Sequence, residues 1–159
     1  MLQWQTRPPF NKQHLSELSR LLISEQDFSL LTESLGEDWW KKEFLNPWLR
    51  KWQDFEISLR NELVKIRANR RKVETTQYLR RETSQSYEFT QIAAHAYRLP
   101  SPQEAEQLLD LTRWQFIEEL TLGHYFDLEV LLAYGLKLTI LERWEKIRLS
   151  EKEKLLEKL

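Results

Sequence analysis

One segment restricts the possible folds of this chain more than any other. Residues 123–144, GHYFDLEVLLAYGLKLTILERW, are apolar on nearly every helical face, although 31% of the chain is charged. Charged residues interrupt the segment, so that each of its apolar runs is shorter than the roughly 20 consecutive apolar residues that span a bilayer. A helix that is apolar all round belongs in the middle of a bundle. We therefore expect a buried central helix near residues 128–148.

A glycine inside this helix adds a second expectation. Gly135 costs about 1 kcal/mol relative to Ala in a helix interior. The usual compensation is a neighbouring helix that approaches closely at the glycine. We therefore predict that Gly135 faces such a helix, and that a larger side chain there overpacks the core.

The composition of the remaining chain favours helices over a turn-rich β fold. Only three Gly and five Pro occur among 159 residues, and charged residues and Leu dominate. We predict one all-α domain, residues 1–159, with about six helices. Its expected parts are N-terminal helices in 1–37, a Trp-rich long helix within 38–72, a connector in 73–86, C-terminal helices in 87–148 and a charged tail helix in 149–159.

Several helix starts carry local signals. A side-chain oxygen at the position before a helix can accept a backbone N–H of the first turn, and Pro is favoured at the first helical position. The pattern Ser101-Pro102-Gln103-Glu104 is a capping box. The other predicted caps are Asn11, Asn46 before Pro47, Asp127 for the central helix and Ser150 for the tail helix.

The sequence suits the cytoplasm. Because the chain has no Cys, it has no disulfide and no Cys-ligated metal. The first residues, MLQWQTRPPFNKQ, lack the basic and then apolar segments of a signal peptide. We expect a cytoplasmic protein with no direct membrane insertion.

Charge is unevenly distributed along the chain. Residues 41–72 carry ten Lys or Arg and four Asp or Glu, whereas residues 101–130 carry one Arg and seven Asp or Glu. The net charge of the whole chain is only −1. Two segments of opposite sign in one domain predict neighbouring helices, or else a partner site on one of them.

No catalytic, metal-binding or cofactor-binding residues are predicted, and no small-molecule substrate. The chain has three histidines, His14, His95 and His124, none at the spacing of a metal-binding helix. Glu118 and Glu119 project about 100° apart on a helix, so their carboxylates do not converge. An enzyme that uses His124 with Glu118 or Asp127 is the competing hypothesis, and loss of an activity in His124→Ala would favour it.

Two groups of residues are candidates for a protein interface. Trp39 and Trp40 are adjacent, so both cannot face inward on one helix, and an exposed Trp is a common interface anchor. The second group consists of the arginines Arg67, Arg70 and Arg71 at a basic helix end, which suits docking onto an acidic protein surface. The alternative is a nucleic-acid-binding helical module that uses the basic segment 65–81.

Long stretches of the chain resemble a known family. They are WLRKWQDFEISLRNELVKIRANR, YLRRE and EAEQLLDLTRWQFIEELTLGHYFDLEVLLAYGLKLTILERW, within roughly residues 38–148. They are similar to a small family of unknown function whose members are encoded beside the subunits of bacterial V-type (V/A-type) ATPases. The most specific parts are Leu59-Arg60-Asn61, Arg67, Trp114 to Leu120, Phe126-Asp127, Ala133-Tyr134 and Leu141-Glu142-Arg143-Trp144. At the start of the chain only TRPPF matches the family's usual opening.

A more limited resemblance concerns the end of the chain. It is similar to the closing helices of the V/A-type ATPase C/d subunit, the helical socket that joins the rotor stalk to the membrane ring. Where that subunit continues with Asn-Leu-Arg, this chain has ERWEKIR.

The resemblances imply a function and a partner. They imply a non-catalytic accessory, stalk or assembly protein of a bacterial V/A-type rotary ATPase, which transports protons or sodium ions. Its expected partners are the ATPase subunits. Through that complex, a cytoplasmic protein would lie at the periphery of the membrane.

Overall fold

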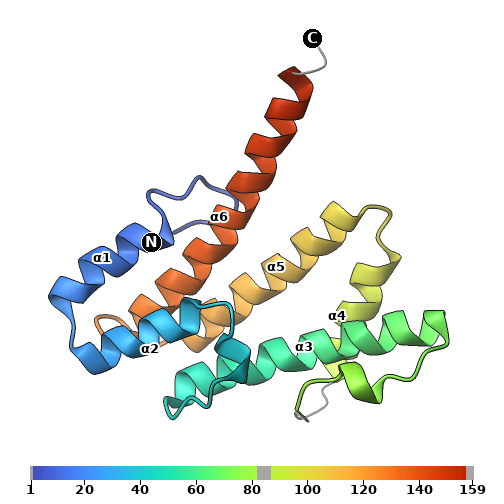
Figure 1. Cartoon of the computed structure of the whole chain (residues 1–159), viewed down its shortest axis with the longest axis horizontal. Helices are drawn as coiled ribbons and strands as arrows, with labels where there is room; N and C mark the ends of the chain where they lie inside the picture. Colours follow the sequence, from blue (N-terminus) through green and yellow to red (C-terminus); the bar gives the residue numbers. More distant parts are fainter. Residues whose placement is uncertain (1, 82–86, 157–159) are drawn as a thin grey trace. The chain divides into compact units, whose positions relative to one another are not determined.

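The computed structural model describes residues 2–81 and 87–156, most of which are helical (Figure 1). Within these residues there are six α-helices, two short 3-10 helices and no strand. The helices are α1 (Lys12–Leu22), α2 (Glu25–Leu35), η1 (Trp39–Lys41), α3 (Pro47–Arg71), η2 (Thr76–Tyr78), α4 (Tyr87–Arg98), α5 (Pro102–Leu120) and α6 (Leu128–Leu156). The predicted all-α fold with about six helices is confirmed.

Four predicted caps begin helices in the structure. In each, a side-chain oxygen accepts a backbone N–H three residues later, which satisfies one of the free donors of the first turn. The pairs are Asn11 with His14 (2.8 Å), Asn46 with Leu49 (3.0 Å), Ser101 with Glu104 (3.0 Å) and Asp127 with Val130 (3.3 Å). Within the Trp-rich segment 38–72, the long helix α3 therefore begins at Pro47 and not earlier.

The predicted tail helix requires correction. We expected a separate helix over residues 149–159 with Ser150 as its cap, but α6 runs without a break from Leu128 to Leu156. The segment after Gly135 contains neither Gly nor Pro, and its Glu, Lys and Leu residues are strong helix formers. Nothing in the local sequence therefore ends the helix before the charged tail.

The chain divides into two compact units, which we describe separately. Unit 1 comprises Met1–Lys42 and Ile117–Leu159, and unit 2 comprises Glu43–Phe116. In the described part of the chain, no helix combines the length and the apolar character that crossing a membrane requires.

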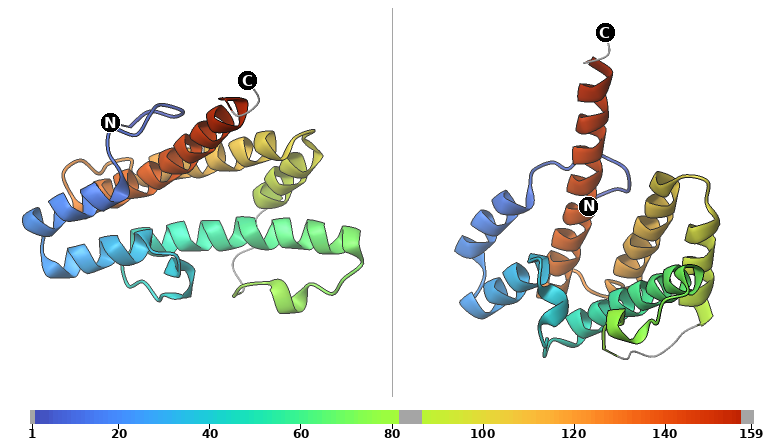
Figure 2. Two further views of the ribbon diagram at one scale, coloured as in Figure 1. Left: turned by 45° about the horizontal axis from the view of Figure 1, so that its top comes forward. Right: turned by 45° about the vertical axis from the view of Figure 1, so that its right-hand side comes forward.

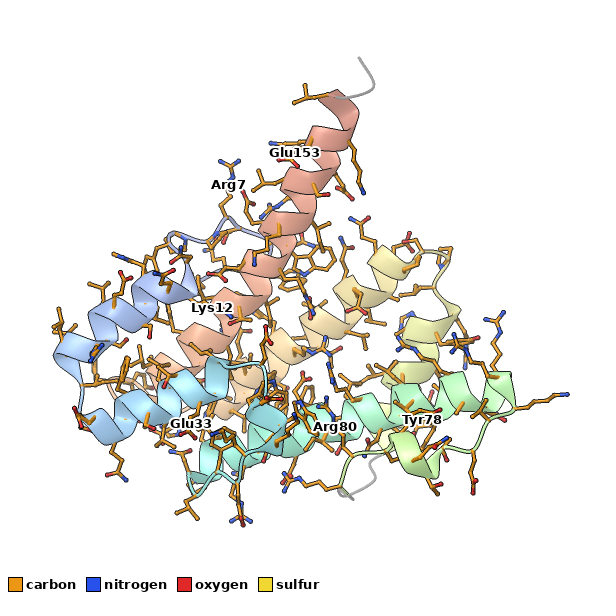
Figure 3. The ribbon with its side chains drawn as sticks, in the orientation of Figure 1. Arg7, Lys12, Glu33, Tyr78, Arg80 and Glu153 are labelled. Carbon is orange, nitrogen blue, oxygen red and sulfur yellow. The ribbon has the colours of Figure 1, made fainter. Side chains whose placement is uncertain are left out.

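In unit 1, α1 and α2 contact each other and both contact α6 (Figures 1 and 2). The fully buried side chains of this unit come from α2, from α6 and from the end of α5: Leu31, Ile117, Leu132, Leu138 and Leu141. Between Leu132 and Trp144, α6 buries residues on several faces, as predicted for the central helix. Its last turns, which carry Glu153, extend beyond α1 and α2 (Figure 3).

At Gly135, α6 packs closely against side chains of α1 and α2. A Cβ atom built at this position would lie 3.1 Å from Cδ1 of Leu35 in α2 and 3.4 Å from Cδ2 of Leu15 in α1. The first of these distances is shorter than an ordinary contact between carbon atoms. The predicted close approach at Gly135 is therefore confirmed.

The N-terminal segment is tied to α6 by polar contacts. Arg7 Nε lies 3.3 Å from an Oε1 atom of Glu145, and the backbone N–H of Lys12 donates to the carboxylate of Glu142. Figure 3 labels Arg7 and Lys12, which both lie beside α6. Residues from the two ends of the chain thus belong to the same compact unit.

Unit 2 has an aromatic centre between its helices. The rings of Phe55 in α3 and Phe116 in α5 stack with centroids 4.0 Å apart, and Trp52 and Phe89 of α4 also contact this pair. Aromatic pairs of this kind are worth about 0.5–1.5 kcal/mol beyond the area they bury. They hold α3, α4 and the first part of α5 together.

A buried ion pair network joins α3 to α5. Arg113 Nε donates to Oε1 of Glu56 at 2.5 Å, and its NH1 donates to Oδ1 of Asp110 at 2.8 Å. Burial alone lowers the pKa of the Arg113 guanidinium, but the two carboxylates more than offset it and hold that pKa above its ordinary value. The basic segment 41–72 and the acidic segment 101–130 are therefore neighbours at this point. The ion pair between them joins Glu56, an acidic residue of the basic segment, to Arg113, the only Lys or Arg of the acidic segment.

The connector after α3 is anchored by a buried amide. Oδ1 of Asn61 accepts the backbone N–H of Arg80 at 3.0 Å, and Nδ2 of Asn61 donates to the carbonyl of Arg81 at 3.4 Å. Arg80 lies beside α3 in Figure 3. The predicted connector thus follows a defined path along α3 as far as residue 81, and residues 82–86 lie outside the described residues.

Candidate functional site

The loop between α5 and α6, residues 121–127, is the most distinctive surface of unit 1. Thr121 continues the last turn of α5, and the backbone N–H of His124 donates to the carbonyl of Thr121 at 3.0 Å. Gly123 between them has φ +86°, a left-handed conformation that glycine adopts without strain. Asp127 then caps α6, so both ends of the loop are fixed by helices.

Large apolar side chains of this loop point into solvent. Leu122 is 78% exposed, Tyr125 is 76% exposed and Phe126 is fully exposed. Single exposed apolar residues are common, whereas a cluster of large ones in one short loop makes this loop a candidate interaction site. These three residues are not among the interface residues predicted from the sequence. The available signal was the pair Tyr125-Phe126 in a turn between two long helices.

A pocket of about 420 Å³ opens beside the loop. Its lining combines residues of the N-terminus, the end of α5, the loop and α6: Leu2, Glu118, Thr121, Leu122, Gly123, His124, Tyr125, Val130, Ala133, Tyr134 and Lys137. Most of the lining side chains are apolar or aromatic, which is typical of sites that accept a ligand or a partner's side chain.

Two polar features stand out in this pocket. Nζ of Lys137 lies 3.0 Å from Oε1 of Glu118, and the Lys137 side chain is only 7% exposed. Burial raises the pKa of the Tyr134 hydroxyl above its ordinary value.

His124, which lines the pocket, forms a cluster with two carboxylates. Its Nδ1 lies 2.6 Å from Oδ2 of Asp127 and 4.0 Å from Oε2 of Glu129. The hydrogen bond with His124 lowers the pKa of the Asp127 carboxyl. Sequence reasoning considered His124 with Asp127 only as a competing catalytic pair and did not include Glu129. The spacing His-x-x-Asp-x-Glu was the available signal.

The residues predicted as an interface lie in different units. Trp39 and Trp40 form η1 in unit 1, and both are half-buried, with the ammonium of Lys41 5.1 Å from the Trp40 ring. The predicted arginines are exposed at the end of α3 in unit 2: Arg67, Arg70 and Arg71. Their common use in one interface stays a prediction.

Several cations of the segment 65–81 are engaged within unit 2. Lys65 pairs with Glu62 at 2.6 Å, and Arg81 pairs with Asp54 at 2.6 Å. Arg70 donates to the Tyr97 hydroxyl at 2.5 Å. The carboxylates that pair with Lys65 and Arg81 reduce the net positive charge of this surface, whereas Arg70 keeps its charge beside the neutral Tyr97 hydroxyl.

Comparisons with known proteins give a family but no described relative. A comparison with curated proteins found no match, and neither did a comparison with solved structures. A family model described as "Protein of unknown function (DUF2764)" matches residues 8–159. The match covers nearly the whole chain, including most of the N-terminal region, where the family resemblance rests only on TRPPF. The chain therefore belongs to this family of proteins of unknown function, DUF2764.

Proposed function

We propose that this protein is a non-catalytic accessory, stalk or assembly protein of a bacterial V/A-type rotary ATPase. The observation that carries the binding role is the exposed apolar loop 121–127 beside an apolar pocket. The partner is suggested by the resemblance of residues 38–148 to proteins encoded beside the subunits of that ATPase. The two arguments are independent, because one concerns the surface and the other concerns the sequence.

The loop has the properties of an interface anchor. Binding energy at protein interfaces is concentrated in a few residues, and large aromatic side chains are over-represented among them. Tyr125 is largely exposed and Phe126 fully exposed, so burying their rings against a partner would contribute favourable free energy by removing apolar surface from water. The adjacent pocket offers a place for an apolar side chain of the partner.

A second contact is proposed at the basic end of α3. Arg67, Arg70 and Arg71 of unit 2 would dock onto an acidic surface of the complex. Trp39 and Trp40 of unit 1 are proposed separately as an apolar anchor. Exposed charges are screened beyond about 8–10 Å at physiological ionic strength, so this contact weakens as salt rises. The apolar contact through Tyr125 and Phe126 resists salt.

The test is a pull-down from the protein's own cells. The tagged protein is captured at low and at high salt, and the proteins and nucleic acids that follow it are identified. We expect ATPase subunits. DNA or ribosomes in their place would favour the nucleic-acid module that uses residues 65–81. Recovery of neither, in cells that express the ATPase, would refute the proposal.

Matched variants connect the pull-down to the loop. In Tyr125→Ser/Phe126→Ser the apolar anchor is lost, and we expect the recovery of ATPase subunits at high salt to fall at least tenfold. The control is Leu21→Ser/Leu22→Ser at the end of α1, where two leucines are 83% and 80% exposed. Equal losses in both double variants would show that the loop is not the anchor.

A further inference from the structure

One nitrogen atom in the α5–α6 loop faces two carboxylates. Nδ1 of His124 lies 2.6 Å from Oδ2 of Asp127 and 4.0 Å from Oε2 of Glu129, and one ligand atom from each of the three residues lies within 4.8 Å of the others. We propose that His124, Asp127 and Glu129 bind a divalent transition-metal ion of the zinc class. The ion would take the place of the proton that His124 and Asp127 share.

The ligand set selects the class of ion. One imidazole nitrogen and two carboxylate oxygens suit Zn²⁺ and its neighbours, whereas Mg²⁺ and Ca²⁺ favour oxygen ligands alone. Bonds of about 2.0–2.2 Å place tetrahedral ligands roughly 3.3–3.6 Å apart. The His124–Asp127 pair would open and the His124–Glu129 pair would close, each by less than about 1 Å. With three protein ligands, at least one coordination position stays open to water or to a partner's side chain.

The backbone orients two of the three ligands in advance. Oδ1 of Asp127 accepts the Val130 N–H at 3.3 Å as the cap of α6, which leaves Oδ2 directed at His124. The turn at Gly123 and the hydrogen bond from the His124 N–H to the Thr121 carbonyl fix the backbone that carries the His124 ligand. Hydrogen bonds of this kind hold ligands in the required orientation at established metal sites.

The charges favour a cation despite the helix terminus. The N-terminus of α6 opposes a positive ion by about 0.3–1 kcal/mol at an exposed position. Two carboxylates next to each other outweigh this term, because each interacts directly with the ion. The three side chains are 34%, 42% and 21% exposed for His124, Asp127 and Glu129, so a hydrated ion reaches them from solvent.

The position of the ligands gives the ion a role. Tyr125 and Phe126 lie between ligands 124 and 127, so the ion would close a short chelate loop around the two exposed aromatic residues. A closed loop has fewer conformations to lose when it binds a partner. The metal site itself does not depend on the identity of that partner.

The test is a titration of the full-length protein with Zn²⁺ followed by calorimetry, and with Co²⁺ followed by its visible absorption. We expect one equivalent of Zn²⁺ and the absorption of a four-coordinate cobalt site. Asp127→Asn keeps a good helix cap but removes the charged ligand. Since even outer-shell changes cost about 10–100-fold in metal affinity, His124→Ala and Asp127→Asn should each lose at least about tenfold.

The control is a second histidine with one carboxylate in the same i, i+3 relation. Nδ1 of His14 lies 3.9 Å from Oε2 of Glu17. Among the described residues, no third possible metal ligand joins this pair. His14→Ala should bind zinc as the wild type does. Binding that is unchanged in His124→Ala, or no binding by the wild type up to roughly 1 mM Zn²⁺, would overturn the proposal. Since the titration uses the protein alone, its failure would leave the pull-down result unaffected.

Discussion

Replacement of Gly135 tests the packing of unit 1 most directly. Gly135 is buried in α6, and a Cβ atom there would already lie 3.1 Å and 3.2 Å from the two Cδ atoms of Leu35 and 3.4 Å from Cδ2 of Leu15. In Gly135→Leu a whole isobutyl group must enter this space. The side chains of α1 and α2 that line it would have to move, or α6 would have to shift away from them.

The expected magnitude follows from two opposing terms. Overpacking of a well-packed core costs about 1–3 kcal/mol, and the short Cβ distances place this site near the upper end. Replacing Gly with Leu in a helix returns about 0.8–1 kcal/mol through helix propensity. We therefore expect a net loss of about 2 kcal/mol in the free energy of unfolding. For a chain of this size, that loss corresponds to a decrease of roughly 4–8 °C in Tm.

The assay is unfolding by heat and by urea, followed by circular dichroism. Gly135→Ala should lie within about 1 kcal/mol of the wild type, because the half-buried Leu35 can move by a few tenths of an ångström and propensity offsets the contact. Glu153→Leu adds the same side chain at an exposed position of the same helix and should change stability by no more than about 0.5 kcal/mol. A Gly135→Leu protein that melts at or above the wild-type temperature would refute the reasoning.

Three further predictions concern unit 2. Arg113→Ala leaves Glu56 and Asp110 buried without their partner, and should lower the free energy of unfolding by about 3–5 kcal/mol in urea titrations. Asn61→Ala removes both hydrogen bonds that tie the connector to α3; it should cost about 1–3 kcal/mol and speed tryptic cleavage after Arg81. The last concerns three exposed arginines of α3: Arg67, Arg70 and Arg71. Their joint replacement by Ser should leave helicity and Tm nearly unchanged, because exposed pairs are worth about 0–1 kcal/mol each; a collapse of the fold would assign them a structural role.

The helix starts could be predicted because capping is a local interaction. Asn46 and Ser101 accept N–H groups only three residues away, so the pattern and the structure depend on the same few residues. The end of α6 could not be predicted in this way. A serine such as Ser150 caps a helix when the residues before it are not helical, and it is an ordinary helical residue when they are. Because α6 is already helical before Ser150, the helix continues through it.

The cluster at the α5–α6 loop was harder to predict than the core. The apolar character of nearly every face of the segment correctly indicated that residues near Leu132 and Leu141 are buried, because a helix that is apolar all round lies inside a bundle. The approach of Glu129 to His124 depends instead on the left-handed conformation of Gly123 and on the angle at which α6 leaves the loop. A turn has no periodic pattern, so its side-chain contacts become visible only in three dimensions.

Two sides of α6 separate the residues that hold unit 1 together from those that a partner can reach. The pocket-lining residues of this helix form one stripe with helical spacing: Val130, Ala133, Tyr134 and Lys137. Gly135 lies on another side of the same turns, against α1 and α2. Because that close contact tolerates shifts of only a few tenths of an ångström, α6 cannot slide along α1 and α2 without losing it. The loop that carries Tyr125 and Phe126 is therefore attached to a helix in a fixed position. Changes at the two aromatic residues should alter binding at constant Tm, whereas a change at Gly135 should alter Tm first and binding only as α6 moves.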